Sequence, residues 1–265
     1  MKFLKNLILY SVGCIICGKP TKAAICSQCI KKFVFSIPQD LINREFIFYK
    51  DKPSQNLIDN TYFLSPYKYT YVSKTLFNSI KRRNNRVGLW AIEEIFNYYI
   101  NIDPFNSFKN LIDIFKNNLL FVFVIPSNPK SKYLRNLNIT NYIARFFITY
   151  LIQKYNTKVI KCSNIVNLNK NAKLQKKLNK LQRLTQAKDK IQINKTLCIT
   201  CIKGYTPATT SYNISVLIID DVTTTGATLF YAKQKINNCL KHIFCQKIQF
   251  ILFTMFNVDI KRQTA

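Results

Sequence analysis

The chain has 265 residues, of which 48% are apolar, and 40 Lys and Arg face only 12 Asp and Glu, giving a formal net charge of +28. This size and apolar content predict one sizeable α/β domain with at most a small appendage, and they exclude a largely disordered chain. The charge favours phosphate-bearing partners, but Lys and Asn recur throughout, as in "NKNAKLQKKLNK" (169–180), so a solvated lysine coat is the alternative.

The N-terminal stretch "MKFLKNLILYSVGC" has some features of a signal peptide. Lys5 and Asn6 interrupt its short apolar run, however, and its small residues fit a cleavage site poorly. Across the chain, no apolar stretch reaches the roughly 20 residues that a membrane-spanning helix needs. We therefore expect a cytoplasmic protein without membrane insertion.

Four cysteines follow in "CIICGKPTKAAICSQC", namely Cys14, Cys17, Cys26 and Cys29, with the spacing C-x2-C-x8-C-x2-C. Each closely spaced pair can direct two thiolates at one ion, and two pairs complete the tetrahedral shell of Zn²⁺. Disulfides are the alternative, but a reducing cytosol disfavours them. Four thiolates leave no open position, so the predicted zinc is structural. We expect residues 1–60 to hold this module and a linker, and residues 61–265 to form the main domain.

From residue 61 onward, strand patterns alternate with helix patterns. Continuous apolar runs such as "LLFVFVI" are typical of strands buried on both faces, whereas apolar residues three or four apart indicate helices. Strands are expected at the start of 67–85 and at 119–125, 158–162, 215–220 and 247–255, and helices at the end of 67–85 and at 87–100, 138–153 and 226–240. Two β-α-β units in this order predict a mainly parallel sheet with helices on both faces.

Other segments carry weaker signals. Residues 30–60 are expected to be irregular, and the polar stretch 167–195 to be a mobile excursion. Cys198 and Cys201 lie in the β-prone run "TLCITCI", where they are expected to be small buried side chains. His242 is the only histidine and has no Cys or Asp partner pattern, so a Ser-His-Asp or Cys-His mechanism is not expected.

The segment "VLIIDDVTTTGATLF" (216–230) combines a buried strand, an acidic pair, a Thr/Gly loop and a helix. Asp220 and Asp221 end the strand, where they can accept hydrogen bonds from vicinal sugar hydroxyls. The loop and the positive end of the next helix offer backbone amides and hydroxyls to a phosphate, with Gly226 allowing close approach. The residues of this predicted ribose-phosphate loop are Val222, Thr223, Thr224, Thr225, Gly226, Ala227 and Thr228. No G-x4-G-K-[ST] sequence is present, which excludes a P-loop.

This segment resembles the phosphoribosyl-pyrophosphate motif of type I phosphoribosyltransferases. Together with the four-cysteine module, the chain resembles the ComF family of competence-associated phosphoribosyltransferase-like proteins over nearly its whole length. The resemblance implies a type I phosphoribosyltransferase-like α/β fold. It also implies that the protein binds phosphoribosyl pyrophosphate with Mg²⁺, with Asp220 and Asp221 as catalytic residues.

Three further segments are similar to family motifs. "YKYTYVSKTLFNSIKRRNN" matches an aromatic strand and a helix with a lysine, here Lys81. "VFVIPSNPKSKYLRNLN" matches a P-V-P-x-x-x-x-R-x-R-G-F-N stretch through Pro126, Arg135 and Asn138. Its Lys130 and Lys132 could support pyrophosphate, with plain surface charge as the alternative. "LQRLTQAKDK" matches a flexible loop through Gln182 and Lys190, where Lys190 replaces the usual arginine and loses its bidentate geometry.

The resemblance implies transfer of phosphoribose to an acceptor that no residue set in the sequence specifies. The alternative is a non-enzymatic accessory protein of DNA uptake, in which the ribose-phosphate loop senses a ligand or is vestigial. Aromatic residues interleaved with Lys and Arg in 67–83 favour single-stranded DNA or competence proteins as partners in that case.

Overall fold

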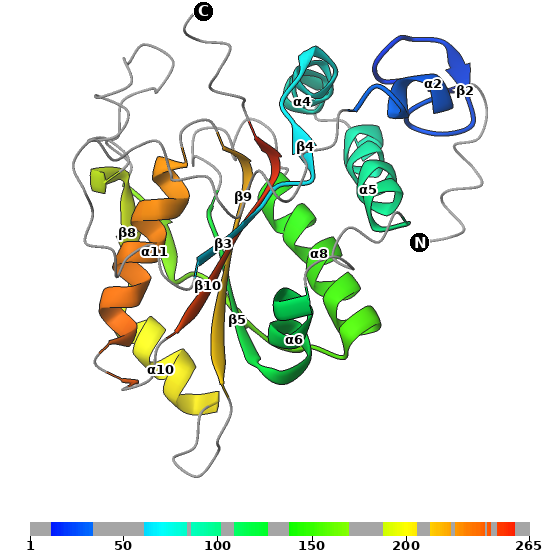
Figure 1. Cartoon of the computed structure of the whole chain (residues 1–265). Helices are drawn as coiled ribbons and strands as arrows, with labels where there is room; N and C mark the ends of the chain where they lie inside the picture. The colour runs from blue at the N-terminus through cyan, green and yellow to red at the C-terminus, as the bar shows by residue number, and fades with distance from the viewer. Residues whose placement is uncertain are drawn as a thin grey trace, which may run out of the picture.

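A computed structural model describes residues 12–33, 61–83, 86–101, 109–126, 138–169, 188–205, 213–223, 226–241, 243–244 and 248–257. Its centre is a six-stranded sheet in the order β3-β10-β9-β5-β6, with β4 pairing with β10 beyond β3 (Figure 1). All of these pairings are parallel. The strands are β3 (Thr61–Leu64), β4 (Tyr67–Lys68), β5 (Leu119–Val124), β6 (Lys158–Cys162), β9 (Ile214–Thr223) and β10 (Gln249–Asn257).

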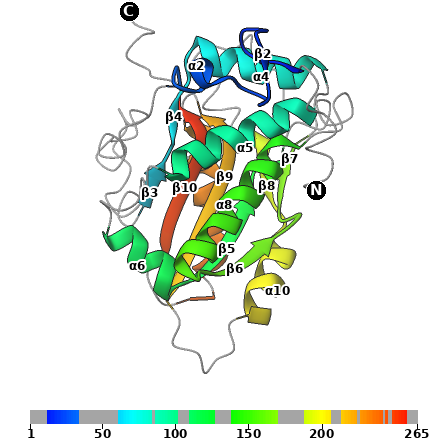
Figure 2. The same ribbon diagram turned by 90° about the vertical axis from the view of Figure 1, so that its right-hand side faces the viewer.

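Helices cover both faces of the sheet, as the sequence predicts. Figure 1 shows α10 (Lys195–Tyr205) and α11 (Ala227–Leu240) on one side, with α5 (Arg86–Asn101), α6 (Lys109–Asn117) and α8 (Ile139–Tyr155) on the other. After a 90° turn, α5 and α8 lie in front of the sheet (Figure 2). The short helix α4 (Tyr71–Arg83) follows β4 and contributes to the same core as α5 and α8.

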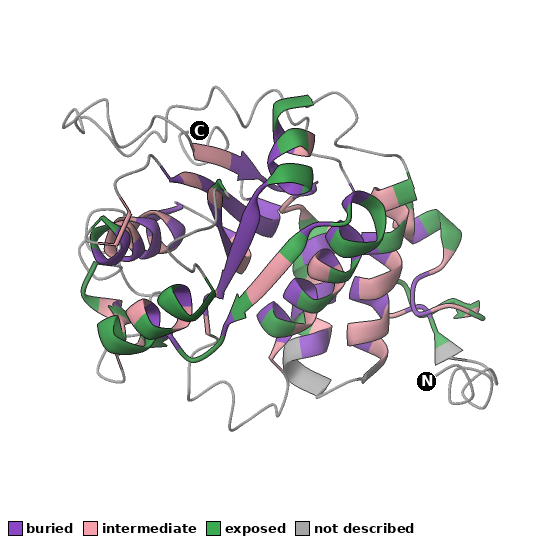
Figure 3. Ribbon diagram, turned by 90° about the horizontal axis from the view of Figure 1, so that it is seen from below, coloured by how far each residue is buried: buried purple, intermediate pink, exposed green. Residues whose placement is uncertain are grey.

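Alternation along the strands divides the interior into two cores. On β9, Leu217 and Ile219 pack with α8, whereas Val216 and Ile218 pack with α10 and α11. Successive strand residues point to opposite faces, so a run that is apolar throughout buries both faces. Figure 3 shows this as buried residues along the strands and the inner helix surfaces. The predicted α/β class with a mainly parallel sheet is therefore confirmed.

Local structure differs from the sequence pattern at one segment, and one predicted strand is shorter than expected. The run around Cys198 and Cys201 is not a strand but helix α10, which Asn194 caps by accepting from the Leu197 amide at 3.1 Å. Cys198 and Ile202, four residues apart, both pack against the sheet, so packing overrides the β propensity of the run. The expected aromatic strand in 67–85 is also short, because β4 covers two residues and α4 begins at Tyr71.

The polar segment 167–195 is partly ordered. Its described ends contain most of an antiparallel pair, β7 (Val166–Leu168) with β8 (Ile191–Ile193). The rest of the segment lies outside the described residues, as do residues 34–60, where the predicted boundary of the first module falls. Among the described residues, no helix combines the length and apolar character needed to span a membrane.

The N-terminal cysteine module (residues 12–33) consists of an antiparallel pair, β1 (Val12–Gly13) with β2 (Pro20–Thr21), and the short helix α2 (Ser27–Ile30). Figures 1 and 2 both place it beside α4 and α5. Its last described residue, Phe33, is 2% exposed and joins the core that also contains Tyr67 and Phe256. The module is thus packed on the main domain.

Candidate functional site

The topology places one candidate site at the carboxyl edge of the sheet. β5 connects through α8 to β6 on one side, while β9 connects through α11 to β10 on the other, and α8 and α11 lie on opposite faces. The neighbouring strands β5 and β9 therefore form a topological switch point. In open α/β sheets, ligands bind outside the carboxyl ends of the strands at such a point. Asp220, Asp221 and the loop after them lie at this end of β9.

The two aspartates form a connected pair. Asp220 Oδ1 accepts from the Asp221 amide at 2.9 Å, and Asp221 Oδ1 accepts from the Val222 amide at 2.8 Å. These bonds fix both side chains against their own backbone, and both residues stay partly exposed. Burial and then the charge of Asp221 raise the pKa of the Asp220 carboxyl well above its usual range. A ligand that supplies positive charge or hydroxyl donors would relieve this unfavourable arrangement.

The described part of the loop has the backbone of an anion site. Gly226 adopts a left-handed conformation at φ 72° as the N-cap of α11. Because glycine has no side chain, it cannot cap the first amides of the helix. The first helical bond is donated by the Phe230 amide to the Gly226 carbonyl at 2.9 Å. The amides before Phe230 thus have no acceptor within the helix, and the helix dipole adds positive potential there. Thr223 and Ala227 are buried, while Val222 and Thr228 are half-buried.

Two residues from other elements lie beside the acidic pair. Lys190, immediately before β8, is close enough to Asp220 that its ammonium partly opposes the rise in the pKa of that carboxyl. Tyr69, just after β4, is held by a 2.7 Å bond from its amide to the Asn257 carbonyl. Burial and then the charge of Asp221 raise the pKa of the Tyr69 phenol.

The structure therefore brings Lys190 to the acidic pair, across about 30 residues of sequence. It also adds Tyr69, which the sequence did not single out. Pairing of β4 with the last residues of β10 brings Tyr69 to this edge, and no local motif signals that pairing. Asn138 caps α8 by accepting from the Asn141 amide at 3.1 Å, and Pro126 follows β5.

The remaining candidate residues are not placed at the site. Lys81 lies in α4, and nothing is described of its side chain. Residues that fall outside the described ranges are Thr224, Thr225, Lys130, Lys132, Arg135 and Gln182.

The four N-terminal cysteines form the second candidate site. The Sγ atoms of Cys14, Cys17, Cys26 and Cys29 all lie within 4.8 Å of one another. Cys17 Sγ and Cys26 Sγ are 3.8 Å apart, which matches the edge of about 3.8 Å expected for a tetrahedron with Zn–S bonds of about 2.3 Å. The predicted proximity of the four thiols is confirmed, and the cluster could hold a metal ion.

Backbone geometry supports this cluster. Gly18 has φ 76° and its amide donates to the Cys14 carbonyl at 2.8 Å, closing the first turn. The Cys26 amide donates to Cys14 Sγ at 3.3 Å. Burial tends to raise the pKa of the Cys14 thiol, but backbone donors outweigh it and lower that pKa to about 7. Burial and then the neighbouring thiols raise the pKa of Cys29. A metal cation among the four sulfur atoms would offset the repulsion between neighbouring thiolate charges.

The side chain of Glu94 on helix α5 bonds to the backbone of the cysteine module. The Glu94 carboxylate accepts from the Ala24 amide at 3.1 Å and from the Ile25 amide at 3.0 Å. Phe33 meets Tyr67 edge-on at 5.7 Å between ring centroids, and Phe256 at 6.2 Å. The segment that leads into Cys26 is thus tied to the domain that carries the acidic pair.

Three of the other described cysteines are unsuited to nucleophilic chemistry. Cys198, expected to be buried, has no exposed surface, and Cys162 and Cys239 are nearly as enclosed. Burial raises the pKa of the Cys162 thiol, and raises that of Cys198 to about 12. A thiol with such a high pKa stays protonated and unreactive.

No protein-family model matches the chain, and a search of curated proteins finds no match. The geometry of the two sites and the sequence motifs thus carry the functional argument.

Proposed function

We propose that the protein is an Mg²⁺-dependent phosphoribosyltransferase of the ComF type, which binds phosphoribosyl pyrophosphate at the carboxyl edge of the sheet and transfers phosphoribose to an acceptor. The observation that carries the proposal is the combination of the Asp220–Asp221 pair with the Gly226 loop at the switch point between β5 and β9. A carboxylate pair suits the ribose diol, and free helix amides suit the 5′-phosphate. The two features lie at consecutive positions of one strand-loop-helix segment.

The chain's own residues would position the sugar and favour the charge that develops on it. Asp220 and Asp221 would accept hydrogen bonds from the 2′- and 3′-hydroxyls and hold C1 toward the acceptor. As the bond to pyrophosphate breaks, positive charge develops at C1, and nearby carboxylates favour that charge. The amides of Ala227 and Thr228 would hold the 5′-phosphate, and Lys190 would face the leaving pyrophosphate. Mg²⁺, when bound with the substrate, would neutralise the pyrophosphate oxygens.

The test is a thermal-shift measurement with phosphoribosyl pyrophosphate and Mg²⁺. A ligand at 100 times its Kd stabilises the native state by about 2.7 kcal/mol, which for this size raises the Tm by about 5–10 °C. Asp220→Asn and Asp221→Asn should abolish the rise. The matched control Glu93→Gln, on α5, should keep it. An unchanged Tm in the wild type would overturn the proposal.

A second candidate is single-stranded DNA binding, in line with competence-related DNA uptake. Tyr71 at the start of α4 is 81% exposed, and exposed Lys74 follows one turn later. An exposed ring beside a cation suits base stacking with phosphate contact. Tyr67 weighs against a wider stacking surface, because it is fully buried and its hydroxyl donates to the Ile95 carbonyl at 2.7 Å. In this case DNA affinity should fall steeply with salt and with Tyr71→Ala, but survive Asp220→Asn.

A further inference from the structure

A separate cavity of about 460 Å³ opens at the amino edge of the sheet, at the opposite end of β9 and β10 from the acidic pair. Its walls come from α6, from the first residues of β9 and β10, and from the segment after α11. This volume lies in the usual range for small-molecule sites. Nothing in the proposed transfer reaction uses this edge.

The lining is unusual for so basic a chain. The sequence contains 40 Lys and Arg, yet none is among the described residues that line the cavity. The polar part of the lining consists mainly of side-chain amides, together with the carboxylate of Asp113. Among the described lining residues an anionic guest would meet no cation, and Asp113 would repel it. The cavity therefore favours a neutral ligand rich in hydrogen-bonding groups.

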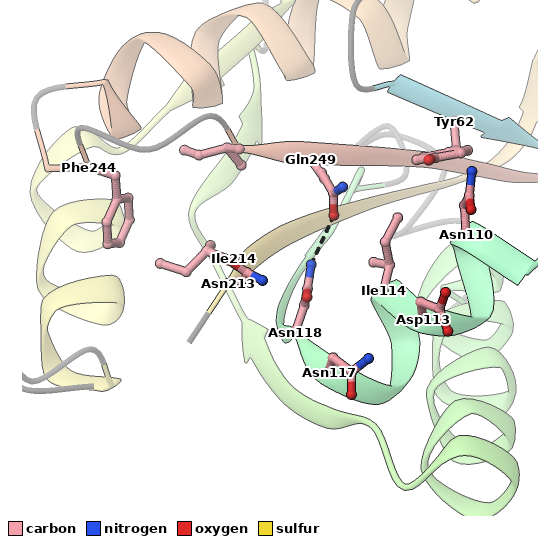
Figure 4. A pocket seen from close by; sticks show the side chains of 11 residues that line it. Tyr62, Asn110, Asp113, Ile114, Asn117, Asn118, Asn213, Ile214, Phe244 and Gln249 are labelled. Atoms are coloured by element: carbon pink, nitrogen blue, oxygen red, sulfur yellow. Dashed lines mark hydrogen bonds between the residues drawn. The ribbon is translucent and has the colours of Figure 1, made fainter. Parts of the chain in front are cut away.

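Two of these amides present unused hydrogen-bonding atoms. Asn118 is only 6% exposed, and its Nδ2 donates to Ser215 Oγ at 2.7 Å and to Gln249 Oε1 at 2.9 Å (Figure 4). Within the described part of the chain, Asn118 Oδ1 and Gln249 Nε2 have no partner, and Thr70 Oγ1 is the only fully enclosed side-chain polar atom without one. Neither atom is fully enclosed, and both residues line the cavity, so one can serve as an acceptor and the other as a donor.

Asn118 and Gln249, which are bonded to each other, therefore offer one acceptor and one donor, and the edge of a nucleobase carries both kinds of group. Figure 4 shows what lies on either side of the Asn118–Gln249 pair. Phe244 and Ile214 lie toward one end, where a flat ring can pack against aromatic and apolar surface. Asp113 and Asn110 lie toward the other end, where a carboxylate can accept from a sugar diol.

We propose that this cavity binds a nucleoside without phosphate. The base lies against Phe244 and Ile214 and is read by Asn118 Oδ1 and Gln249 Nε2, while the ribose hydroxyls donate to Asp113. The buried Asn118–Ser215–Gln249 contacts hold the reading atoms in place, because they join the end of α6 to both strands.

The test is calorimetric titration of the full chain with adenosine, guanosine, cytidine, uridine and their 5′-monophosphates. At least one nucleoside should bind, and about tenfold or more tightly than its monophosphate. Gln249→Leu removes the donor to the base and also the acceptor that holds Asn118 and Ser215, so it should weaken binding by about tenfold or more. The matched control Gln153→Leu, on the exposed side of α8, should leave binding unchanged. Asp113→Asn, an exposed change with little risk to folding, should remove the preference for ribonucleosides over their 2′,3′-dideoxy forms.

Two results would overturn the inference. One is the absence of binding of all four nucleosides at millimolar concentration. The other is binding that Asp220→Asn abolishes while Gln249→Leu and Asp113→Asn leave it intact, because that pattern places the nucleoside at the carboxyl edge. Since the acidic pair takes no part in this cavity, nucleoside binding can fail while phosphoribosyl pyrophosphate binding holds, and the reverse.

Discussion

Replacing Glu94 tests how the cysteine module is held on the main domain. Its carboxylate accepts two backbone bonds, from the amides of Ala24 and Ile25, and those residues are 0% and 3% exposed. Glu94→Leu removes both acceptors and leaves two enclosed N–H groups without a partner. A bond to a charged acceptor contributes about 1.5–3 kcal/mol, and Glu94 is half-buried, so the lower value applies to each. The expected loss is about 3 kcal/mol.

Glu94→Gln keeps one acceptor oxygen and turns an NH₂ group toward the second amide. It should cost about half as much as Glu94→Leu, roughly 1.5–2 kcal/mol. Urea unfolding gives the free energies, and for a chain of this size about 3 kcal/mol corresponds to a Tm lower by about 6–12 °C. Asn97→Ala, at an exposed position of the same helix α5, is the control and should change little.

The same variants also report on the four-cysteine cluster, which could hold a metal ion. Once the cluster is loaded with zinc, Glu94→Leu should speed the loss of that zinc to a coloured chelator, because Glu94 holds the segment before Cys26. Wild-type unfolding and wild-type zinc release in Glu94→Leu would refute the view that this carboxylate fastens the module.

Three other changes probe the same structure. Phe33→Ala removes a fully packed ring between Tyr67 and Phe256. It should lower the free energy of unfolding in urea by about 3–5 kcal/mol. A loss smaller than that of Glu94→Gln would contradict this expectation. Gly226→Ala places a side chain on a residue with φ 72°, so it should lower the free energy of unfolding by about 1–2 kcal/mol. It should also reduce the Tm rise with phosphoribosyl pyrophosphate. A normal rise would show that the loop does not need glycine. Asp220→Asn should stabilise the protein at neutral pH. The native pKa of Asp220 is raised, so the wild type loses stability as pH rises from about 4 through that pKa, whereas the variant should not; parallel stability–pH curves would count against this.

The central elements were predictable because their signals are local. Strands β5, β9 and β10 have longer continuous apolar runs than a strand with one solvent-exposed face would have. These three strands lie in the middle of the sheet. The cysteine spacing likewise determines the cluster, because each pair needs only one turn. Gly226 follows the same logic, since a left-handed residue before a helix is easiest to supply as glycine.

The contacts that join distant segments were not predictable in this way. Tyr69 lies near enough to Asp221, about 150 positions away, for the charge of Asp221 to raise the pKa of its phenol. Glu94 likewise accepts from the Ala24 amide across 70 positions. The helical conformation of α10 was not predictable for a related reason. Its β-branched and cysteine residues favour a strand locally, but Cys198 and Ile202 must face a sheet whose strands come from other parts of the chain.

Strand β9 carries polar residues toward both ends, one group at each of the two candidate ligand sites. The strand is apolar from Val216 to Ile219 and polar at both ends, with Ser215 at the amino end and Asp220 at the carboxyl end. Burial of the middle is sufficient to explain the apolar run, but it does not explain why Ser215, which has no exposed surface, bonds to both Asn118 and Gln249. A buried polar cluster costs stability unless its members are paired, and an apolar residue at Ser215 would avoid that cost. The cluster becomes useful if it fixes Asn118 and Gln249 for a ligand, just as the acidic pair would become useful under the proposed binding of a sugar at the other end.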